Sequence, residues 1–209
     1  MVKRRAAAST LIERRPTGDR IVSTAAAVFA RRGYGATSLR ELMAAANVST
    51  TAFYVRFKSK EDVLDALVQQ LLTDLYAAAS KTLAAGGAID EGFKRGVAAM
   101  TEVLIGHRVA VRLALTEAAT SPKLRDTLSR AYTELASLLG ARLAQLSHAD
   151  ARGGDAAGWA LVGALAMQVQ RWAVFGQIDD RGLAKALSAT AAVLMPTSRP
   201  RKTASARAR

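Results

Sequence analysis

The sequence predicts an all-α protein, with a small basic helical domain near the N-terminus and a larger helical domain after it. Half of the 209 residues are hydrophobic, alanine is abundant and there are only 4 prolines, a composition that favours helices. Apolar residues recur at helical spacing through most of the chain. Short groups of Gly, Pro, Ser and Asn separate these periodic segments and indicate where each helix ends.

The first expected helix runs from Thr17, a suitable N-cap residue, to Arg32. Its buried face is predicted to hold four residues at helical spacing: Ile21, Ala25, Val28 and Phe29. Gly33 and Gly35 then end the helix.

A second helix follows from a capping box, in which Ser38 is the N-cap and Glu41 stands three residues later. Asn47 tolerates the left-handed conformation that ends such a helix. A third helix is therefore expected to begin near Ser49 or Thr50, after a tight turn.

A second capping box at Ser59-Lys60-Glu61-Asp62 predicts the start of a long helix that continues toward Ala85. The remaining helices are expected at 89–105, 107–118, 122–147, 156–175 and 180–195, with a break at 151–154. These elements give a basic disordered arm, a first domain, a helical regulatory and dimerisation domain and a basic disordered tail, at 1–16, 17–62, 63–196 and 197–209.

Charge is concentrated at the two ends of the chain. The net charge is +13, and residues 1–60 carry twelve Lys and Arg against three Asp and Glu. Residues 61–196 are nearly neutral, and the last thirteen residues carry five more cations. A basic domain on a neutral body is typical of nucleic-acid binding. The basic arm either follows the DNA backbone and minor groove or gives only nonspecific attraction.

Several classes of protein are not expected. The chain has no cysteine, and its two histidines, His107 and His148, lie far apart, so we expect no disulfide and no metal. Neither a secretory pattern nor a membrane span is visible, which predicts a cytoplasmic location. Residues 89–195 carry no catalytic pattern, so we expect neither an enzyme nor a cofactor.

The third helix has the pattern of a helix that lies in a DNA groove. On a helical wheel, Phe53 and Phe57 point inward together. The opposite side carries small residues, including Thr51 and Val55, whose hydroxyl and methyl groups suit base edges. Tyr54 and Arg56 lie on the flanks, where phosphate oxygens would be reached. Ser38 and Lys60 stand at helix starts, where anions are also favoured.

Three segments occur in order in the first domain, AVFARRGYGATS, SLRELMAAANVS and FYVRFKSKE. With these segments, residues 17–62 resemble the DNA-binding domain of the TetR family of transcriptional regulators. The resemblance implies a homodimer on a palindromic operator in double-stranded DNA. By motif position, Ser38, Tyr54 and Lys60 match phosphate-contacting residues, and Arg40, Thr50, Thr51 and Val55 match positions that often touch bases. The whole expected DNA-binding set is Ser38, Arg40, Ser49, Thr50, Thr51, Tyr54, Val55, Arg56 and Lys60.

The sequence departs from the family pattern at three positions. Asn47 and Thr51 stand where glycine is frequent, and Arg56 replaces the usual histidine. Asn47 tolerates the same backbone, and Thr51 adds a side chain that could add sequence preference. Arg56 carries a permanent charge, which is expected to strengthen phosphate binding near neutral pH.

The resemblance also implies that the last two long helices form the dimer interface, with Leu161, Leu165, Val169, Leu183, Leu187 and Leu194 as its apolar residues. The alternative is that these helices pack only within one subunit. A ligand pocket is expected among the middle helices, lined by Phe93, Met100, His107, Tyr132, Trp159, Met167, Trp172 and Phe175. Because few charges lie among these residues, the expected ligand is small and apolar or aromatic.

The sequence thus predicts a sequence-specific DNA-binding transcriptional regulator, a repressor that a small apolar or aromatic ligand releases. Two alternatives stay open at this point. One is an activator or global regulator that needs no ligand, and the other is a helical carrier of small lipophilic molecules with incidental DNA contact.

Overall fold

The computed structural model describes residues 17–84, 89–147 and 151–194, which form helices and contain no strand. The predicted basic arm and tail lie outside these residues. The helices are α2 (Thr17–Arg32), α3 (Leu39–Ala45), α4 (Thr50–Tyr54), α5 (Lys60–Ala84), α6 (Ile89–Gly106), α7 (Arg108–Glu117), α8 (Pro122–Ser147), α9 (Ala151–Ala173) and α10 (Asp180–Leu194).

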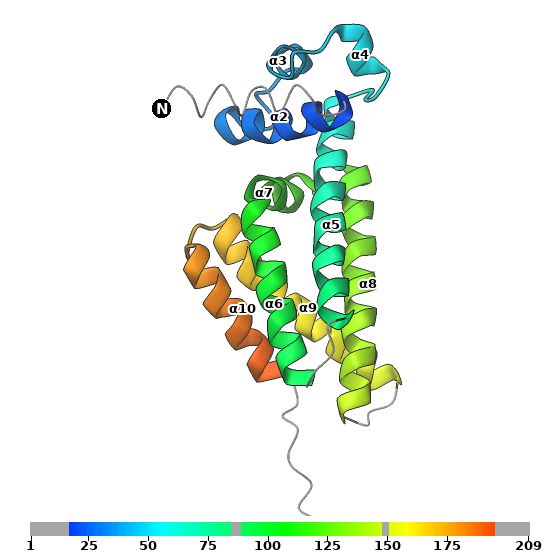
Figure 1. Ribbon diagram of the computed structural model, residues 1–209, viewed down its shortest axis with the longest axis vertical. Coiled ribbons are helices and arrows are strands. Elements are labelled where there is room, and N and C mark those ends of the chain that lie inside the picture. The colour runs from blue at the N-terminus through cyan, green and yellow to red at the C-terminus, as the bar shows by residue number, and fades with distance from the viewer. Residues whose placement is uncertain (1–16, 85–88, 148–150, 195–209) are drawn as a thin grey trace, which may run out of the picture.

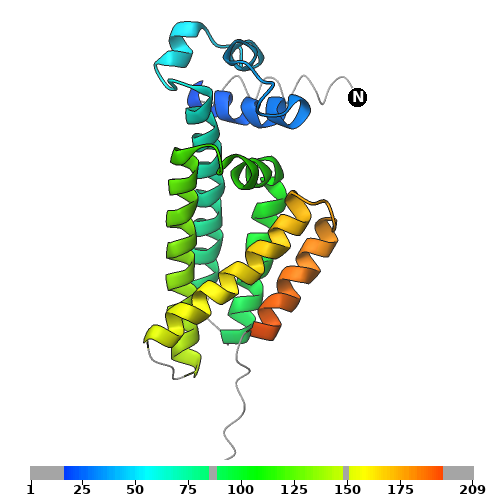
Figure 2. The same cartoon turned by 180° about the vertical axis from the view of Figure 1, so that it is seen from behind.

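The molecule is elongated, and α2, α3 and α4 form one end of it (Figure 1). Helix α5 leaves this end and runs beside α8 along the length of the body, as both Figure 1 and Figure 2 show. Helix α7 lies across the body directly below α2. Helices α6, α9 and α10 complete the body on the other side, with α9 packed on both α8 and α10.

The local signals at the first helices are confirmed. Glu41 N–H donates to Ser38 Oγ at 3.3 Å, and Ser38 N–H donates to Glu41 Oε2 at 2.9 Å, so both halves of the capping box are present. Asn47 has a φ of 51° and makes the left-handed turn between α3 and α4. The backbone therefore turns sharply enough to set α4 against the end of α3.

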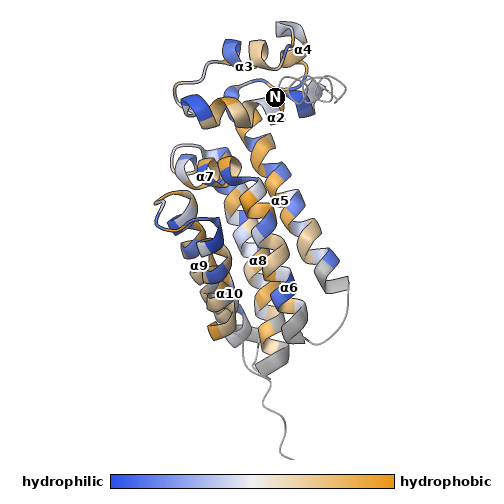
Figure 3. Cartoon of the chain, turned by 60° about the vertical axis from the view of Figure 1, so that its left-hand side comes forward, coloured by the Kyte–Doolittle hydropathy of each residue, from blue (hydrophilic) through white to orange (hydrophobic). Residues whose placement is uncertain are grey.

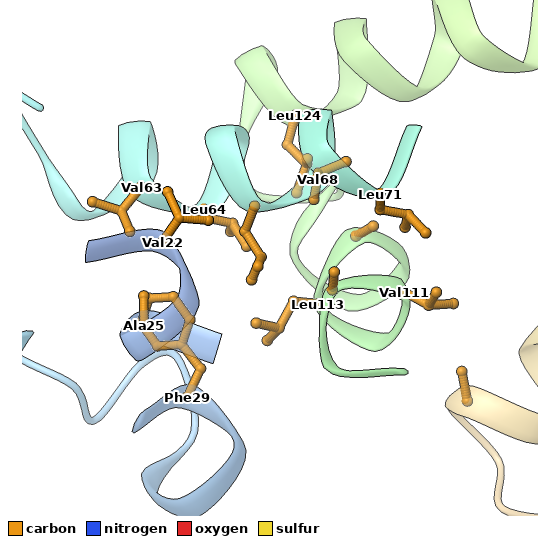
Figure 4. Close-up of a cluster of buried hydrophobic side chains, with 14 of the residues drawn as sticks. Val22, Ala25, Phe29, Val63, Leu64, Val68, Leu71, Val111, Leu113 and Leu124 are labelled. Atoms are coloured by element: carbon orange, nitrogen blue, oxygen red, sulfur yellow. The ribbon is translucent and has the colours of Figure 1, made fainter. Parts of the chain in front are cut away.

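One core joins the end domain to the body. Val22 and Phe29 of α2 pack with Leu64 and Val68 of α5, and Leu113 of α7 extends the same cluster (Figure 4). All five side chains are buried. Burial of apolar surface stabilises by roughly 25 cal/mol per Å². The position of α2–α4 is therefore tied to α5 and α7 by hydrophobic packing.

Helix α9 begins earlier than the sequence predicts. Residues 151–154 are helical, whereas Gly153-Gly154 predicted a break. Gly154 and Gly158 face α8 at close range, where a Cβ on Gly154 would lie 2.9 Å from the carbonyl oxygen of Gly140. A Cβ on Gly158 would collide with the Ala136 carbonyl oxygen. These glycines allow α9 to pack closely against α8, because a larger residue would collide with the α8 backbone. This packing outweighs the low helix propensity of glycine.

The described ranges lack two further features, a membrane-spanning helix and a cluster of metal ligands. No helix in them is long and apolar enough to cross a membrane. In the same ranges, no three His, Asp or Glu side chains gather where they could hold a metal ion.

Candidate nucleic-acid interface

Helix α4 is a short helix held by one deeply buried ring. Phe53 has no exposed surface, and its ring lies 5.9 Å from that of Phe57, centroid to centroid. Ser49 is the N-cap, and its hydroxyl accepts a hydrogen bond from Ala52 N–H at 3.2 Å. A helix of five residues has too few internal hydrogen bonds to be stable alone, so this anchoring fixes its direction.

The side of α4 opposite Phe53 faces away from the rest of the protein. Thr50, Thr51 and Arg56 are exposed, and the exposed fractions are 51% for Tyr54 and 75% for Val55. The pattern of inward aromatics and outward small residues expected from the sequence is thus present. Single exposed apolar side chains such as Val55 are common on protein surfaces. The exposed methyl groups of Val55 are available for contact with a partner.

Helix α3 and the turn before it lie beside this surface (Figure 1). Arg40 and Ser38 are exposed, although the Ser38 hydroxyl also donates to Glu41 Oε2 at 3.0 Å. Hydrogen bonds from the backbone and side chain of Ser38 hold the pKa of Glu41 below its usual range. Glu41 also forms an ion pair with Arg32. The carboxylate is therefore satisfied within the domain and is not a free negative charge facing a ligand.

Lys60 has a different environment from the one expected. Its ammonium donates to three carbonyl oxygens, those of Tyr34 at 2.7 Å, Thr37 at 2.8 Å and Gly35 at 3.2 Å. It also lies 4.5 Å from the centre of the Tyr34 ring. All three donors of the ammonium are used, so we propose a structural role for Lys60 in place of the predicted phosphate contact. Lys60 fastens the loop after α2 to the start of α5.

We expect Lys60→Met to lower the free energy of unfolding by about 1.5–3 kcal/mol, because three backbone carbonyls lose a charged donor. The slope of log affinity for DNA against log salt should change by less than the ~0.9 that one lost phosphate contact produces. Urea unfolding and salt titrations of duplex binding measure the two quantities. Lys58→Met removes an exposed cation two residues away and is the matched control. Unchanged stability of Lys60→Met with a reduced slope would restore the phosphate role.

The body of the protein contains an apolar cavity of about 180 Å³. Helices α5, α6, α7, α8, α9 and α10 all contribute to its lining. Of the expected pocket residues, Met100 and Tyr132 line it. Leucines that the sequence reading did not assign to a pocket supply much of the rest, among them Leu71, Leu75, Leu104, Leu128 and Leu135. Their only signal was an apolar stripe, which also describes ordinary core.

The other six expected pocket residues do not line this cavity. Phe93 packs against the core, and His107 bonds to Asp74, with 2.8 Å between Nε2 and Oδ2. Trp172 is fully buried, and its indole N–H donates to Asp180 at 2.7 Å.

Trp159, Met167 and Phe175 are exposed, at 44%, 49% and 54%. Trp159 precedes the buried Leu161 by two residues and so points to nearly the opposite side of α9.

The expected dimer residues also need correction. Leu161, Leu183 and Leu187 are buried within the single subunit, and Leu165 and Val169 line the cavity together with Leu187. Leu194 is the exposed member of the set, at 40%. The large leucines of α9 and α10 face inward because they are the residues that fill the core of the body. The outward face of α9 carries alanine and glycine together with the exposed Trp159 and Met167.

The first domain is similar in sequence to known regulatory proteins. Residues 21–67 match the family model described as bacterial regulatory proteins, tetR family. The HTH-type transcriptional repressor DhaR of Mycobacterium sp. (strain GP1) is 34% identical over 70 residues, which are 34% of this chain and 35% of that protein. The curated relatives are matched over only 16 to 35% of their own length.

Solved structures match over most of the chain. A transcriptional regulator from Aquifex aeolicus VF5 has a TM-score of 0.69 at 19% identity, over 86% of this chain and 100% of that one. The fatty acid degradation regulator FadR from Bacillus halodurans has a TM-score of 0.69 at 21% identity, over 90% of this chain and 99% of that one. At these identities the likeness concerns the fold.

Proposed function

We propose that this chain, which belongs to the TetR family of bacterial regulatory proteins, is a homodimeric repressor that binds a palindromic operator and that a small apolar ligand releases. The observation that carries the proposal is the exposed face of α4, anchored by Phe53 and flanked by Tyr54 and Arg56. In this proposal Thr50, Thr51 and Val55 read base edges in the major groove, with Arg40 of α3 beside them. Ser38, Ser49, Tyr54 and Arg56 contact phosphates.

Release by a ligand is supported by the position of α7. Val111, Ala114 and Leu115 of this helix line the cavity. Its Ala110 and Leu113 belong to the core that includes α2. A ligand that displaces α7 therefore acts on a helix that packs against α2 of the DNA-binding end. It lowers DNA affinity only if it binds more tightly to the conformation whose two α4 helices no longer fit adjacent major grooves.

A dimer interface on the outward faces of α9 and α10 is supported by their uncovered apolar residues. On α9 these are Ala156, Trp159, Ala160, Gly163 and Met167, which are all exposed, and the exposed Val174 directly follows the helix. Val193 of α10 is 82% exposed, and Ala189 lies one turn before it. Both helices carry weakly hydrophobic colour along much of their length (Figure 3). Small residues permit two pairs of helices to approach closely, and contiguous apolar surface of this kind marks interaction sites.

We expect Met167→Glu to convert the dimer to a monomer at micromolar concentration, because the substitution places a charge in the apolar interface. Sedimentation equilibrium measures the mass. Ser129→Glu adds the same charge to an exposed position on α8, outside this surface, and should leave a dimer. If Met167→Glu stays dimeric, the interface lies elsewhere.

Selection of bound duplexes from a random pool tests the proposed function. The full-length protein should enrich an inverted repeat whose half-sites are centred one helical turn, about 10–10.5 base pairs, or a multiple of it apart. Binding to all duplexes with equal affinity would contradict a sequence-specific regulator. That result would favour a carrier of lipophilic molecules with incidental DNA contact.

A further inference from the structure

We infer that Lys123 of α8 is a positioning residue for DNA binding, because it holds the turn between α4 and α5 through Asp62 and so fixes the direction of α4 relative to the body. The inference rests on the proposed role of α4 in the major groove. It concerns how this helix is held, and it adds a connection through α8 to the packing of α7 against α2.

The turn between α4 and α5 is held by the Asp62 carboxylate. The Lys58 N–H group donates to Asp62 Oδ2 at 2.9 Å, and Ser59 Oγ accepts a hydrogen bond from Asp62 N–H at 3.1 Å. Asp62 lies in the first turn of α5, so both bonds fasten the turn to this helix. Helix α4 ends at Tyr54, directly before the same turn, so a movement of the turn is passed on to α4.

Lys123 connects this carboxylate to the start of α8. Its ammonium donates to the other oxygen of Asp62, Oδ1, at 2.8 Å, and lies 3.4 Å from Asp65 Oδ2. The bond from Lys123 lowers the pKa of Asp62, and the same bond raises the pKa of Lys123. Both groups are therefore ionised at pH 7. One carboxylate thus joins α8, through one oxygen, to the turn after α4, through the other.

Two further contacts hold the same parts of α5 and α8 together. Ser121 acts as an N-cap for α8, since its hydroxyl accepts a hydrogen bond from Leu124 N–H at 3.1 Å, and this hydroxyl also donates to Glu61. The Thr127 hydroxyl donates to Asp65 Oδ1 at 3.1 Å. Ser121 and Thr127 are both buried. The start of α8 is therefore fixed beside α5, and the ammonium reaches the carboxylate from a fixed backbone.

Helix α8 continues from these contacts to the cavity. Leu128, one residue after Thr127, and Tyr132 both line it. Figure 1 and Figure 2 show that α8 runs beside α5 over this length. A ligand that moves α8 therefore also moves Lys123, and with it the turn that follows α4.

A distance measurement between two spin labels tests the position of α4 without DNA. The chain has no cysteine, so Val55→Cys and Ser129→Cys give two attachment points, directly after α4 and on α8. Labelled full-length protein is mixed with excess unlabelled protein, so that distances between subunits do not contribute. We expect Lys123→Met to broaden the distance distribution and Lys123→Arg, which keeps the charge, to retain it. Arg125→Met removes an exposed cation two residues away and should leave it unchanged.

Operator binding tests the consequence for function. Because Lys123 is 48% exposed, water screens the pair, and we expect Lys123→Met to weaken binding of the selected operator by about 3- to 10-fold. The preference for this operator over a duplex with one base pair inserted between the half-sites should fall, since a loosely held α4 tolerates both spacings. The slope of log affinity against log salt should change by less than the ~0.9 of one phosphate contact.

A double-mutant cycle tests whether Lys123 acts through Asp62. Asp62→Asn keeps an acceptor for the Lys58 N–H group but removes the charge that Lys123 meets. It should weaken operator binding to a similar degree, and adding Lys123→Met to it should have little further effect.

Four results would overturn the inference. The distance distribution of Lys123→Met could match that of the wild-type protein. Lys123→Met could weaken both operator spacings equally, which would indicate a general structural role, or lower the salt slope by a full phosphate contact, which would place the ammonium on DNA. The effects of Lys123→Met and Asp62→Asn could be additive. By contrast, a broadened distribution in a protein that selects no operator supports the inference and contradicts only the proposed function.

Discussion

Phe53→Ala is expected to lower the free energy of unfolding by about 3–5 kcal/mol and to abolish operator binding. The ring has no exposed surface and joins α4 to the core that α2 and α5 share. Its loss leaves a cavity and frees a helix of five residues that has no other buried side chain. Urea unfolding and fluorescence anisotropy with a labelled duplex measure the two effects.

Tyr54→Ala is the matched control for this substitution. It removes a ring of similar size from the next position, where 51% of the side chain is exposed. The unfolding free energy should therefore change by less than about 1 kcal/mol, while DNA affinity falls on all sequences because a phosphate contact is lost. Equal destabilisation by the two substitutions would show that Phe53 does not anchor α4.

Val55→Asp is expected to reduce operator affinity by at least about 100-fold, or roughly 2.8 kcal/mol, without a change in stability. Val55 is 75% exposed, so the folded protein loses little packing. In the complex, however, the carboxylate would meet the phosphates and acceptor-rich base edges of the groove. Anisotropy titration gives the affinity, and thermal unfolding checks that the fold is retained.

Ser129→Asp introduces the same charge at an exposed position on α8 and controls for net charge alone. The protein carries a formal charge of +13, so one added carboxylate remote from DNA should change affinity by less than about threefold. If both substitutions weaken binding equally, the effect is long-range and α4 is not at the groove.

The helix boundaries of the first domain were predictable because each depends on residues close in sequence. Ser38 and Glu41 satisfy one another within a single turn, and Asn47 supplies the left-handed turn by itself. Ser59 likewise accepts a hydrogen bond from Asp62 N–H at 3.1 Å at the start of α5. Such signals need no knowledge of the rest of the fold.

The role of Lys60 and the two faces of α9 could not be predicted in this way. Lys60 is bound by carbonyls more than twenty residues earlier in the chain, and nothing local indicates that they would meet its ammonium. Between Ala156 and Met167, helix α9 is apolar on all sides because alanine, glycine and tryptophan surround its leucines. The hydrophobic periodicity therefore did not indicate which side of α9 faces the core. Packing on α8 decided which of these residues became buried.

The central claim is that the exposed face of α4 enters the major groove, and site-directed crosslinking tests it most directly. The chain has no cysteine, so Val55→Cys gives a single attachment point for a photoreactive group. The account predicts crosslinks to bases in both half-sites of the selected operator, and none from the same group on Ser129→Cys. Crosslinks that are absent from Val55→Cys, or equally frequent from Ser129→Cys, would contradict it.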